Sequence, residues 1–105
     1  MVYTVEELKQ RVKPVAEKYN LHEVYLFGSY ARNEATAESD VDLLVDRTGS
    51  KIRGMFEMGG LYEDLRESIQ KEVDLITTQT LEQASTRERT PLFVENVQAE
   101  RIRLI

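Results

Sequence analysis

The sequence contains no cysteine and no tryptophan, and it has one histidine and two prolines among its 105 residues. The absence of cysteine excludes disulfide bonds and thiolate metal sites. The chain also lacks an apolar run near the roughly 18 residues that span a membrane, and it has no basic-then-apolar leader at its N-terminus. We therefore expect a cytoplasmic protein that makes no contact with a membrane.

The charged residues give little support for nucleic-acid binding. The net charge is −5, and the 14 Lys and Arg residues are scattered among 19 Asp and Glu residues. A protein that grips phosphate backbones usually concentrates its positive charge, so we expect no direct nucleic-acid binding. With 41% hydrophobic and 31% charged residues, the chain has the composition and length of one globular domain, which we expect to cover residues 1–105.

Apolar periodicity predicts helices and strands in alternation. Thr4 and Glu7 have capping-box spacing ahead of a first helix that ends near Asn20, and Pro14 should kink this helix or divide it into two short segments. Strands are expected at 23–27, 41–45 and 72–76. Further helices are expected at 52–70 and from Pro91, with a short edge strand or docking segment at 101–105. The polar residues 77–89 lack a clear period.

The stretch from residue 25 to residue 46 carries the strongest functional signal. Gly28 and Ser29 follow a predicted strand, ten residues intervene, and Asp40 and Asp42 then open the next strand. Ser29 is expected to cap a short helix at 30–33. Side chains at i and i+2 of a strand share a face, so the two carboxylates should lie side by side.

These acidic residues suit a divalent cation. Two neighbouring carboxylates repel each other unless one is protonated or a cation lies between them. Asp74 lies within a later predicted strand and must point opposite to Val73 and Leu75, so it could supply a third carboxylate. Oxygen ligands of this kind suit magnesium or manganese, and such ions can promote phosphoryl or nucleotidyl transfer.

The Gly-Ser pair predicts a phosphate site next to these acids. Gly28 would let the backbone approach a ligand closely, and Ser29 would stand at a helix N-terminus that attracts anions. Arg32 follows one turn later and could point to the same anion. Each feature alone is common: a Gly-Ser turn, an Asp-x-Asp pair and a lone strand aspartate are usually structural or solvated. Their combination in this order favours a functional site.

Other residues are expected to be structural. His22 stands at a predicted turn and should lie on the surface, and no histidine is near Ser29 in the sequence to activate it for acyl transfer. Met55, Phe56 and Met58 are expected in the core rather than in a groove for a partner.

The motif Gly28-Ser29, ten residues, Asp40-x-Asp42, followed by Asp74 in VDLI, resembles the signature of the polymerase-beta-type nucleotidyltransferase superfamily. The stretch LFGSYARNEATAESDVDLLVD is similar in particular to the minimal nucleotidyltransferases, many of which are antitoxins of HEPN/MNT toxin–antitoxin pairs. The resemblance covers residues 21–76 clearly and implies an α/β (α+β) fold, with a small mixed sheet of three to four strands flanked by helices. Asn33 stands where many relatives have glycine.

The resemblance implies a role for each motif residue. Gly28 and Ser29 would bind the nucleotide phosphates, and we expect Arg32, from its position one turn later, to join them. Asp40 and Asp42 would bind magnesium, and Asp74 would complete the metal site and help to activate the acceptor hydroxyl. Family members of the antitoxin type transfer AMP from ATP to a tyrosine of a HEPN-domain ribonuclease toxin, which implies a protein partner and a possible hetero-oligomer.

Two alternatives remain open from the sequence. The chain could neutralise its partner by occlusion, as a binding antitoxin in which catalysis is incidental or absent. It could also modify a small molecule, although relatives that do so generally carry an added domain for the acceptor. The sequence does not identify the acceptor residue or the number of AMP units transferred.

Overall fold

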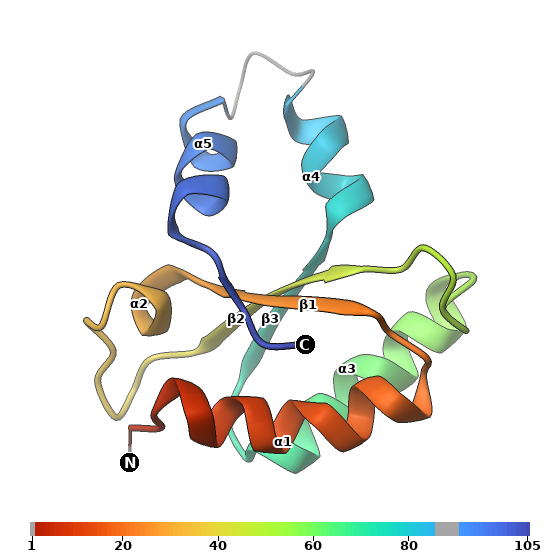
Figure 1. The fold of residues 1–105 in the computed structure, drawn as a ribbon, viewed down its shortest axis with the longest axis horizontal. Coiled ribbons are helices and arrows are strands. Elements are labelled where there is room, and N and C mark those ends of the chain that lie inside the picture. Colours follow the sequence, from red (N-terminus) through yellow and green to blue (C-terminus); the bar gives the residue numbers. More distant parts are fainter. Residues whose placement is uncertain (1, 86–90) are drawn as a thin grey trace.

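A computed structural model describes residues 2–85 and 91–105 and has a four-stranded mixed sheet at its centre, in the order β3-β2-β1-β4. The sheet and the helices that flank it confirm the expected α+β class (Figure 1). In chain order the elements are α1 (Val5–Lys18), β1 (Glu23–Phe27), α2 (Gly28–Ala31), β2 (Val41–Asp46), α3 (Met55–Ile69), β3 (Val73–Thr77), α4 (Thr78–Ser85), α5 (Pro91–Glu100) and β4 (Ile102–Arg103).

Helix α1 begins with the predicted capping box. The Glu7 backbone N–H donates to the Thr4 hydroxyl at 3.1 Å, and the Thr4 backbone N–H donates to the Glu7 carboxylate at 2.9 Å. The expectation of two short segments is wrong, because one helix continues through Pro14. Pro14 is exposed, so water can reach the carbonyl that loses its partner, while buried residues on both sides of it hold the helix against the core.

The register of the sheet follows the predicted strands. β1 pairs with β2 in antiparallel fashion and places Phe27 opposite Asp42. β2 pairs with β3 in parallel fashion and places Asp42 opposite Asp74. The expected terminal edge strand is present as β4, which pairs with β1. The parallel pair can form because α3 provides the crossover connection between β2 and β3.

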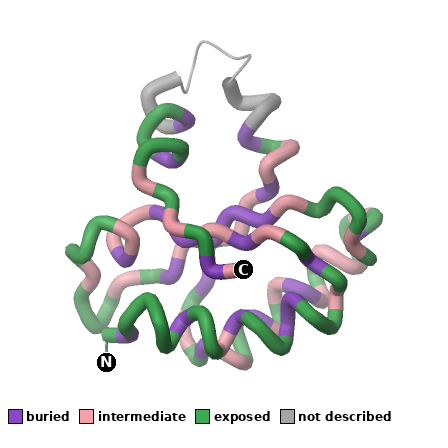
Figure 2. The backbone as a smooth tube through the Cα atoms, viewed as in Figure 1, coloured by how far each residue is buried: buried purple, intermediate pink, exposed green. Residues whose placement is uncertain are grey.

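Helices α1 and α3 cover one face of the sheet and form the larger core with it (Figures 1 and 2). Every second residue of β2 points into this core: Val41, Leu43 and Val45 are all fully buried. From α3 the core receives Leu61, Leu65 and Ile69. Burial of this alternating set fixes the faces of the strands, since a shift of one residue would move the apolar side chains into solvent.

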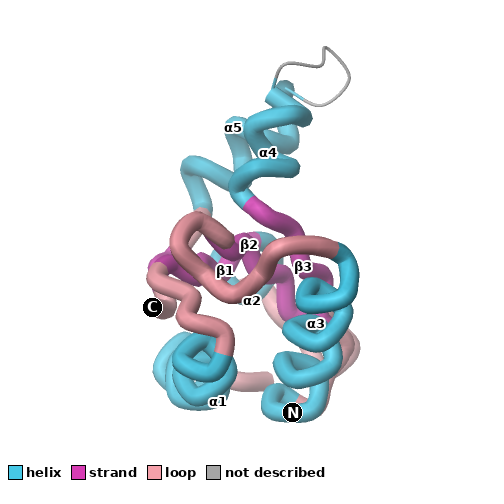
Figure 3. Tube along the Cα trace, turned by 90° about the vertical axis from the view of Figure 1, so that its right-hand side faces the viewer, coloured by secondary structure: helices cyan, strands magenta, loops and turns pink. Residues whose placement is uncertain are grey.

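Helices α4 and α5 lie over the opposite face, where a smaller cluster joins Phe27 and Leu44 to Leu81, Val94 and Val97 (Figure 3). Residues 78–85, for which the sequence shows no clear apolar period, form helix α4, and residues 86–90 lie outside the described part. The helix forms because Thr77 accepts a bond from the Thr80 backbone N–H at 3.0 Å and Leu81 is buried.

Helix α3 begins at Met55 rather than near Ile52, and its first turn is exposed. Met55 and Phe56 are 88% and 90% exposed, so the expectation that they belong to the core is wrong, whereas Met58 packs against it in part. The apolar stripe extends to the first turn, but the sheet only reaches the later turns of the helix. His22 is exposed, as expected. Among the described helices none has the length and apolar content needed to cross a membrane.

Candidate active site

Three carboxylates meet at one end of the neighbouring strands β2 and β3. Asp42 and Asp74 occupy paired positions, and Asp40 lies two residues before Asp42, just ahead of the strand. Val41 and Val73 are buried against α1 and α3, so strand alternation places the acids toward the other face of the sheet. Asp40 and Asp74 are exposed and Asp42 is half-buried. The structure therefore brings Asp74 to the Asp40–Asp42 pair.

Asp40 and Asp74 are close enough to Asp42 to affect its ionisation. Burial, together with the negative charges of Asp74 and Asp40, raises the pKa of Asp42 from 3.8 to about 6, while the positive charge of Arg32 acts in the opposite direction. A carboxyl group in this position is driven toward its neutral form unless a cation neutralises the cluster. Perturbed ionisation of this kind is typical of functional sites.

The donor set of these acids fits a divalent cation. Carboxylate oxygens are the ligands that magnesium and manganese prefer, and a bound cation would offset the repulsion that raises the pKa of Asp42. Within the described part of the chain, no three acidic or histidine side chains are oriented to hold one ion together. Joint coordination would thus require rotation of the carboxylate side chains about their own bonds.

Gly28 closes the site on the side of β1, and no other residue fits there. Its φ of +73° lies in the region that glycine adopts freely. A Cβ atom built at Gly28 would lie 2.0 Å from Asp42 Oδ2 and 2.9 Å from Asp42 Cγ. The glycine therefore permits both the turn at the end of β1 and the close approach of that turn to a carboxylate of the cluster.

The helix after Gly28 differs in its start from the sequence prediction. α2 begins at Gly28, with Phe27 at the N-cap position, so Ser29 lies inside the first turn and is not the cap. The left-handed conformation of Gly28 turns the chain at once, which leaves no extended residue between strand and helix. Tyr30 is 6% exposed and anchors α2 in the core. Asn33 has a φ of 59°, in the left-handed region that asparagine adopts more readily than most residues other than glycine.

Arg32 lies near the cluster but is held by other acidic side chains. Its Nε donates to Glu34 at 3.1 Å and its Nη1 donates to Glu100 at 3.0 Å. Its effect on the pKa of Asp42 shows that its charge is felt at the site. Sequence analysis missed Glu100, which lies 68 residues away at the end of α5. No sequence pattern identifies this partner, because only the return of β4 to β1 brings α5 beside α2.

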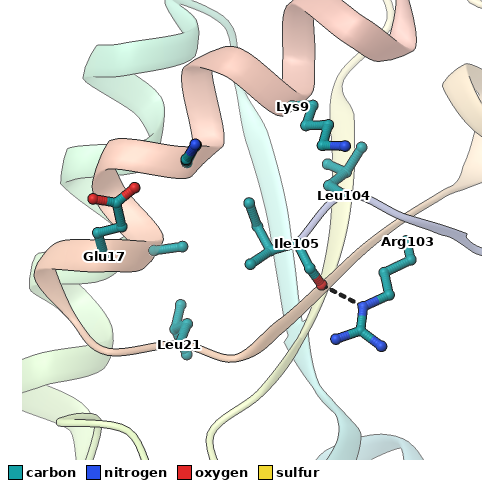
Figure 4. A pocket seen from close by; sticks show the side chains of 8 residues that line it. Lys9, Glu17, Leu21, Arg103, Leu104 and Ile105 are labelled. Atoms are coloured by element: carbon teal, nitrogen blue, oxygen red, sulfur yellow. Dashed lines mark hydrogen bonds between the residues drawn. The ribbon is translucent and has the colours of Figure 1, made fainter.

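A hollow of about 450 Å³ between α1 and the C-terminal segment is a separate feature (Figure 4). Its charged lining residues are Lys9, Lys13, Glu17 and Arg103. Arg103 Nε donates to the Ile105 carbonyl at 2.6 Å across its edge. None of the three clustered aspartates lines it, and it contains a single carboxylate side chain. The carboxylate cluster therefore remains the better candidate for chemistry on phosphates.

Comparison with known proteins gives relatives of one kind. The chain is 34% identical over 82 residues to the protein adenylyltransferase MntA of Thermococcus cleftensis, which covers 74% of this chain and 81% of that protein. It is 36% identical over 73 residues to MJ0435 of Methanocaldococcus jannaschii, with 70% and 76% covered, and 37% identical over 76 residues to MJ1379 of the same organism, with 72% and 76% covered. Both of these are named among the protein adenylyltransferases.

Solved structures show the same fold at low sequence identity. A toxin–antitoxin crystal structure with AMP-PNP has a TM-score of 0.67 at 20% identity, and a mutant of the toxin–antitoxin MntA-HpeT has a TM-score of 0.68 at 16% identity. Each match covers 92% of this chain and 72% of the other. The sequence model of the nucleotidyltransferase domain family matches residues 5–104 of this chain. The chain therefore belongs to the nucleotidyltransferase domain family.

Proposed function

We propose that this nucleotidyltransferase transfers AMP from ATP to a tyrosine hydroxyl of a HEPN-type toxin, depends on magnesium, and thereby acts as an antitoxin. The observation that carries the proposal is the position of Asp42. It lies opposite Asp74 in the sheet, two residues from Asp40, and its carboxylate lies next to the Gly28 turn. A cluster of carboxylates against a glycine turn suits a reaction in which phosphates and their counter-ions must approach the backbone closely.

Each site residue has a proposed role. Asp40 and Asp42 hold magnesium, Asp74 completes the metal site, and Gly28 and Ser29 receive the nucleotide phosphates, with Arg32 beside them. The bound ion supplies positive charge that offsets the charge on the phosphates. The tyrosine oxygen bonds to the α-phosphorus, the bond to the bridging oxygen breaks, and pyrophosphate leaves. The hydroxyl proton passes to a carboxylate of the cluster, for which Asp74 is our assignment.

The relatives support the choice of donor and acceptor. A protein adenylyltransferase joins AMP to a protein, and the relatives that bear this name share 34 to 37% of their aligned residues with this chain. The toxin–antitoxin neighbour with AMP-PNP contains an ATP analogue. With ATP as the donor and a toxin as the partner, the proposal also places the chain in the cytoplasm and in a hetero-oligomer with that toxin. AMPylation of a small molecule has no comparable support.

Occlusion without catalysis is the second candidate. Met55 and Phe56 are almost fully exposed in the first turn of α3, and such side chains often mark a binding surface. On this reading the chain neutralises its partner by covering it, and the acidic cluster contributes nothing.

The test compares two double variants in the presence of radioactively labelled ATP, magnesium and a HEPN-type toxin. Asp40→Asn with Asp42→Asn should reduce labelling of the toxin at least about a hundredfold, because the metal ligands lose their charge. Glu17→Gln with Glu63→Gln removes the same charge from exposed positions outside the site and should label normally. Full labelling by the Asp40/Asp42 variant would disprove the proposal. Loss of labelling with full neutralisation of the toxin would establish occlusion.

A further inference from the structure

The outer edge of β3 is the feature that the proposed reaction leaves unexplained. Within residues 2–85 and 91–105, β3 pairs with β2 alone, so it forms an edge of the sheet beside α3 (Figure 3). The Val41 backbone N–H donates to the Glu72 carbonyl at 3.0 Å. In a parallel ladder the direction of the backbone groups alternates, so the N–H and C=O groups of Val73 and Leu75 point away from β2. Such an edge is a template for another strand.

An apolar groove follows this edge over its whole length. Two hollows of about 340 and 370 Å³ lie between β3 and the start of α3, and both are lined by Met55, Met58 and Leu75. The first extends to Val73 and Asp74, and the second extends to Thr77. The groove therefore joins the exposed first turn of α3 to the strand that carries the third carboxylate.

We propose that an extended segment of the acceptor protein pairs along the outer edge of β3 as an added strand, which places its acceptor side chain beside Asp74. This inference rests on the proposed function, because it assigns the way in which the acceptor binds. The residue opposite Asp74 would share a face with Asp74 and Asp42. The residues before and after it would point to the other face, over Met55 and Met58. The segment thus presents a tyrosine between two apolar residues.

Charge identifies a foreign, basic segment as the occupant rather than a second copy of this chain. Pairing of two copies through β3 would bring two Asp74 carboxylates onto one face at short range, where like charges repel. At this edge the carboxylates of Asp40, Asp42 and Asp74 lie together and Glu57 lies in the first turn of α3, while Arg47 lines the hollow at the other end; the whole chain has a net charge of −5. Asp64 of α3 faces α1 instead, where it pairs with Lys18 at 2.8 Å. Lysine or arginine at the ends of the segment would complement this surface.

The experiment uses a synthetic peptide, acetyl-Lys-Thr-Val-Tyr-Val-Thr-Lys-amide, with magnesium and ATP. Hydrogen exchange measured by NMR reports pairing independently of catalysis. Saturating peptide should slow exchange of the Val73 and Leu75 amides about tenfold. The same peptide with N-methyl groups on both valines lacks the backbone N–H groups that would donate hydrogen bonds to the carbonyls of Val73 and Leu75. It should therefore leave the exchange of the Val73 and Leu75 amides unchanged. AMP transfer to the tyrosine should be lost with the methylated peptide.

The possible outcomes separate the two proposals. Slowed exchange at β3 without AMP transfer would support strand addition but would refute the placement of the acceptor side chain beside Asp74, while labelling of the toxin decides the transferase function separately. Transfer to both peptides with unchanged exchange at β3 would support the transferase function and refute strand addition. No change of exchange and no transfer would also refute strand addition. Sedimentation that shows a dimer which the peptide does not disrupt, with β3 amides already protected, would assign the edge to a second copy instead.

A surface variant tests the groove without altering the reacting groups. Met55→Ser removes an apolar side chain that is 88% exposed in the free protein, so its stability should not change. Its Kd for the unmethylated peptide should rise about fivefold, while the KM for ATP stays the same. Val2→Ser is the matched control, because Val2 is also an exposed apolar residue, at 47%, and does not line either hollow. Equal affinity of both variants for the peptide would contradict the role of the groove.

Discussion

The pKa of Asp42 is raised by some of its surroundings and lowered by others. Burial disfavours its charged form, the neighbouring charges of Asp74 and Asp40 add to this effect, and Arg32 favours the charged form. Because the folded-state pKa is raised above 3.8 to about 6, the folded chain holds this proton more tightly than the unfolded chain. In the metal-free protein this carboxyl therefore reduces stability increasingly as the pH rises from about 4 to about 6, and the cost is complete above that range.

Asp42→Asn should therefore stabilise the metal-free protein. At pH 7.5 in EDTA we expect an increase in the free energy of unfolding of about 1 kcal/mol, after allowance for the partial exposure of the carboxylate. At pH 4 the difference should nearly vanish, since wild-type Asp42 is then protonated in the folded state. Urea unfolding at both pH values provides the measurement, and the single variant Glu17→Gln, at an exposed position outside the cluster, is the control. Destabilisation by Asp42→Asn at pH 7.5 would contradict this account.

The acids of the site could be predicted from the sequence, but their surroundings could not. Strand alternation alone placed Asp40 and Asp42 on one face and Asp74 opposite to Val73 and Leu75. The contact between Gly28 and Asp42 depends on the register of β1 against β2, and the bonds of Arg32 to Glu34 and Glu100 depend on where α5 packs. Neither is a property of a local pattern, so sequence analysis directed Arg32 at a phosphate alone.

At the scale of elements, the sequence predicted helices and strands correctly where the residues of the element itself determine its structure. The capping box of α1, the strand β1 and the terminal edge strand β4 each follow from residues within the element. The errors concern tertiary context. Packing carries α1 through Pro14, burial of Leu81 supports the otherwise polar α4, and the extent of the sheet leaves Met55 in solvent. An apolar period identifies a helix but does not show how much of it the sheet covers.

The capping box of α1 can be tested by two substitutions at its two ends. Thr4→Ala removes the hydroxyl that accepts from the Glu7 N–H and should lower the free energy of unfolding by about 1 kcal/mol, or the Tm by about 4 to 8 °C. Glu7→Gln keeps an acceptor for the Thr4 N–H and should change the Tm far less. Thermal unfolding followed by circular dichroism gives both values. An equal loss for the two variants would contradict this expectation, because it would mean that the charge of Glu7 stabilises α1 as much as the bond to the Thr4 hydroxyl does.

At the scale of the whole molecule, helices cover both faces of the sheet while the acidic end of β2 and β3 stays accessible. Val41 and Val73 pack into the core on the face covered by α1 and α3. The smaller apolar cluster that contains Leu44 lies further along the strands, under α4 and α5. The fold thus fixes the backbone positions of Asp40, Asp42 and Asp74 rigidly while their mutual repulsion persists. A ligand that relieves this repulsion binds the folded chain in preference to the unfolded one, so it must raise global stability.

Magnesium should therefore stabilise this chain through the acidic cluster. At a concentration ten times its Kd, an ion that binds one site on the folded chain adds about 1.4 kcal/mol, or about 6 to 11 °C in Tm. Differential scanning calorimetry in EDTA and in a magnesium series should show this rise for the wild type and for the Glu17→Gln, Glu63→Gln double variant. The Asp40→Asn, Asp42→Asn variant should show no rise, because it lacks the charges that attract the ion. Equal stabilisation of all three proteins would place the ion elsewhere on the acidic surface and would remove Asp40 and Asp42 from the proposed metal site.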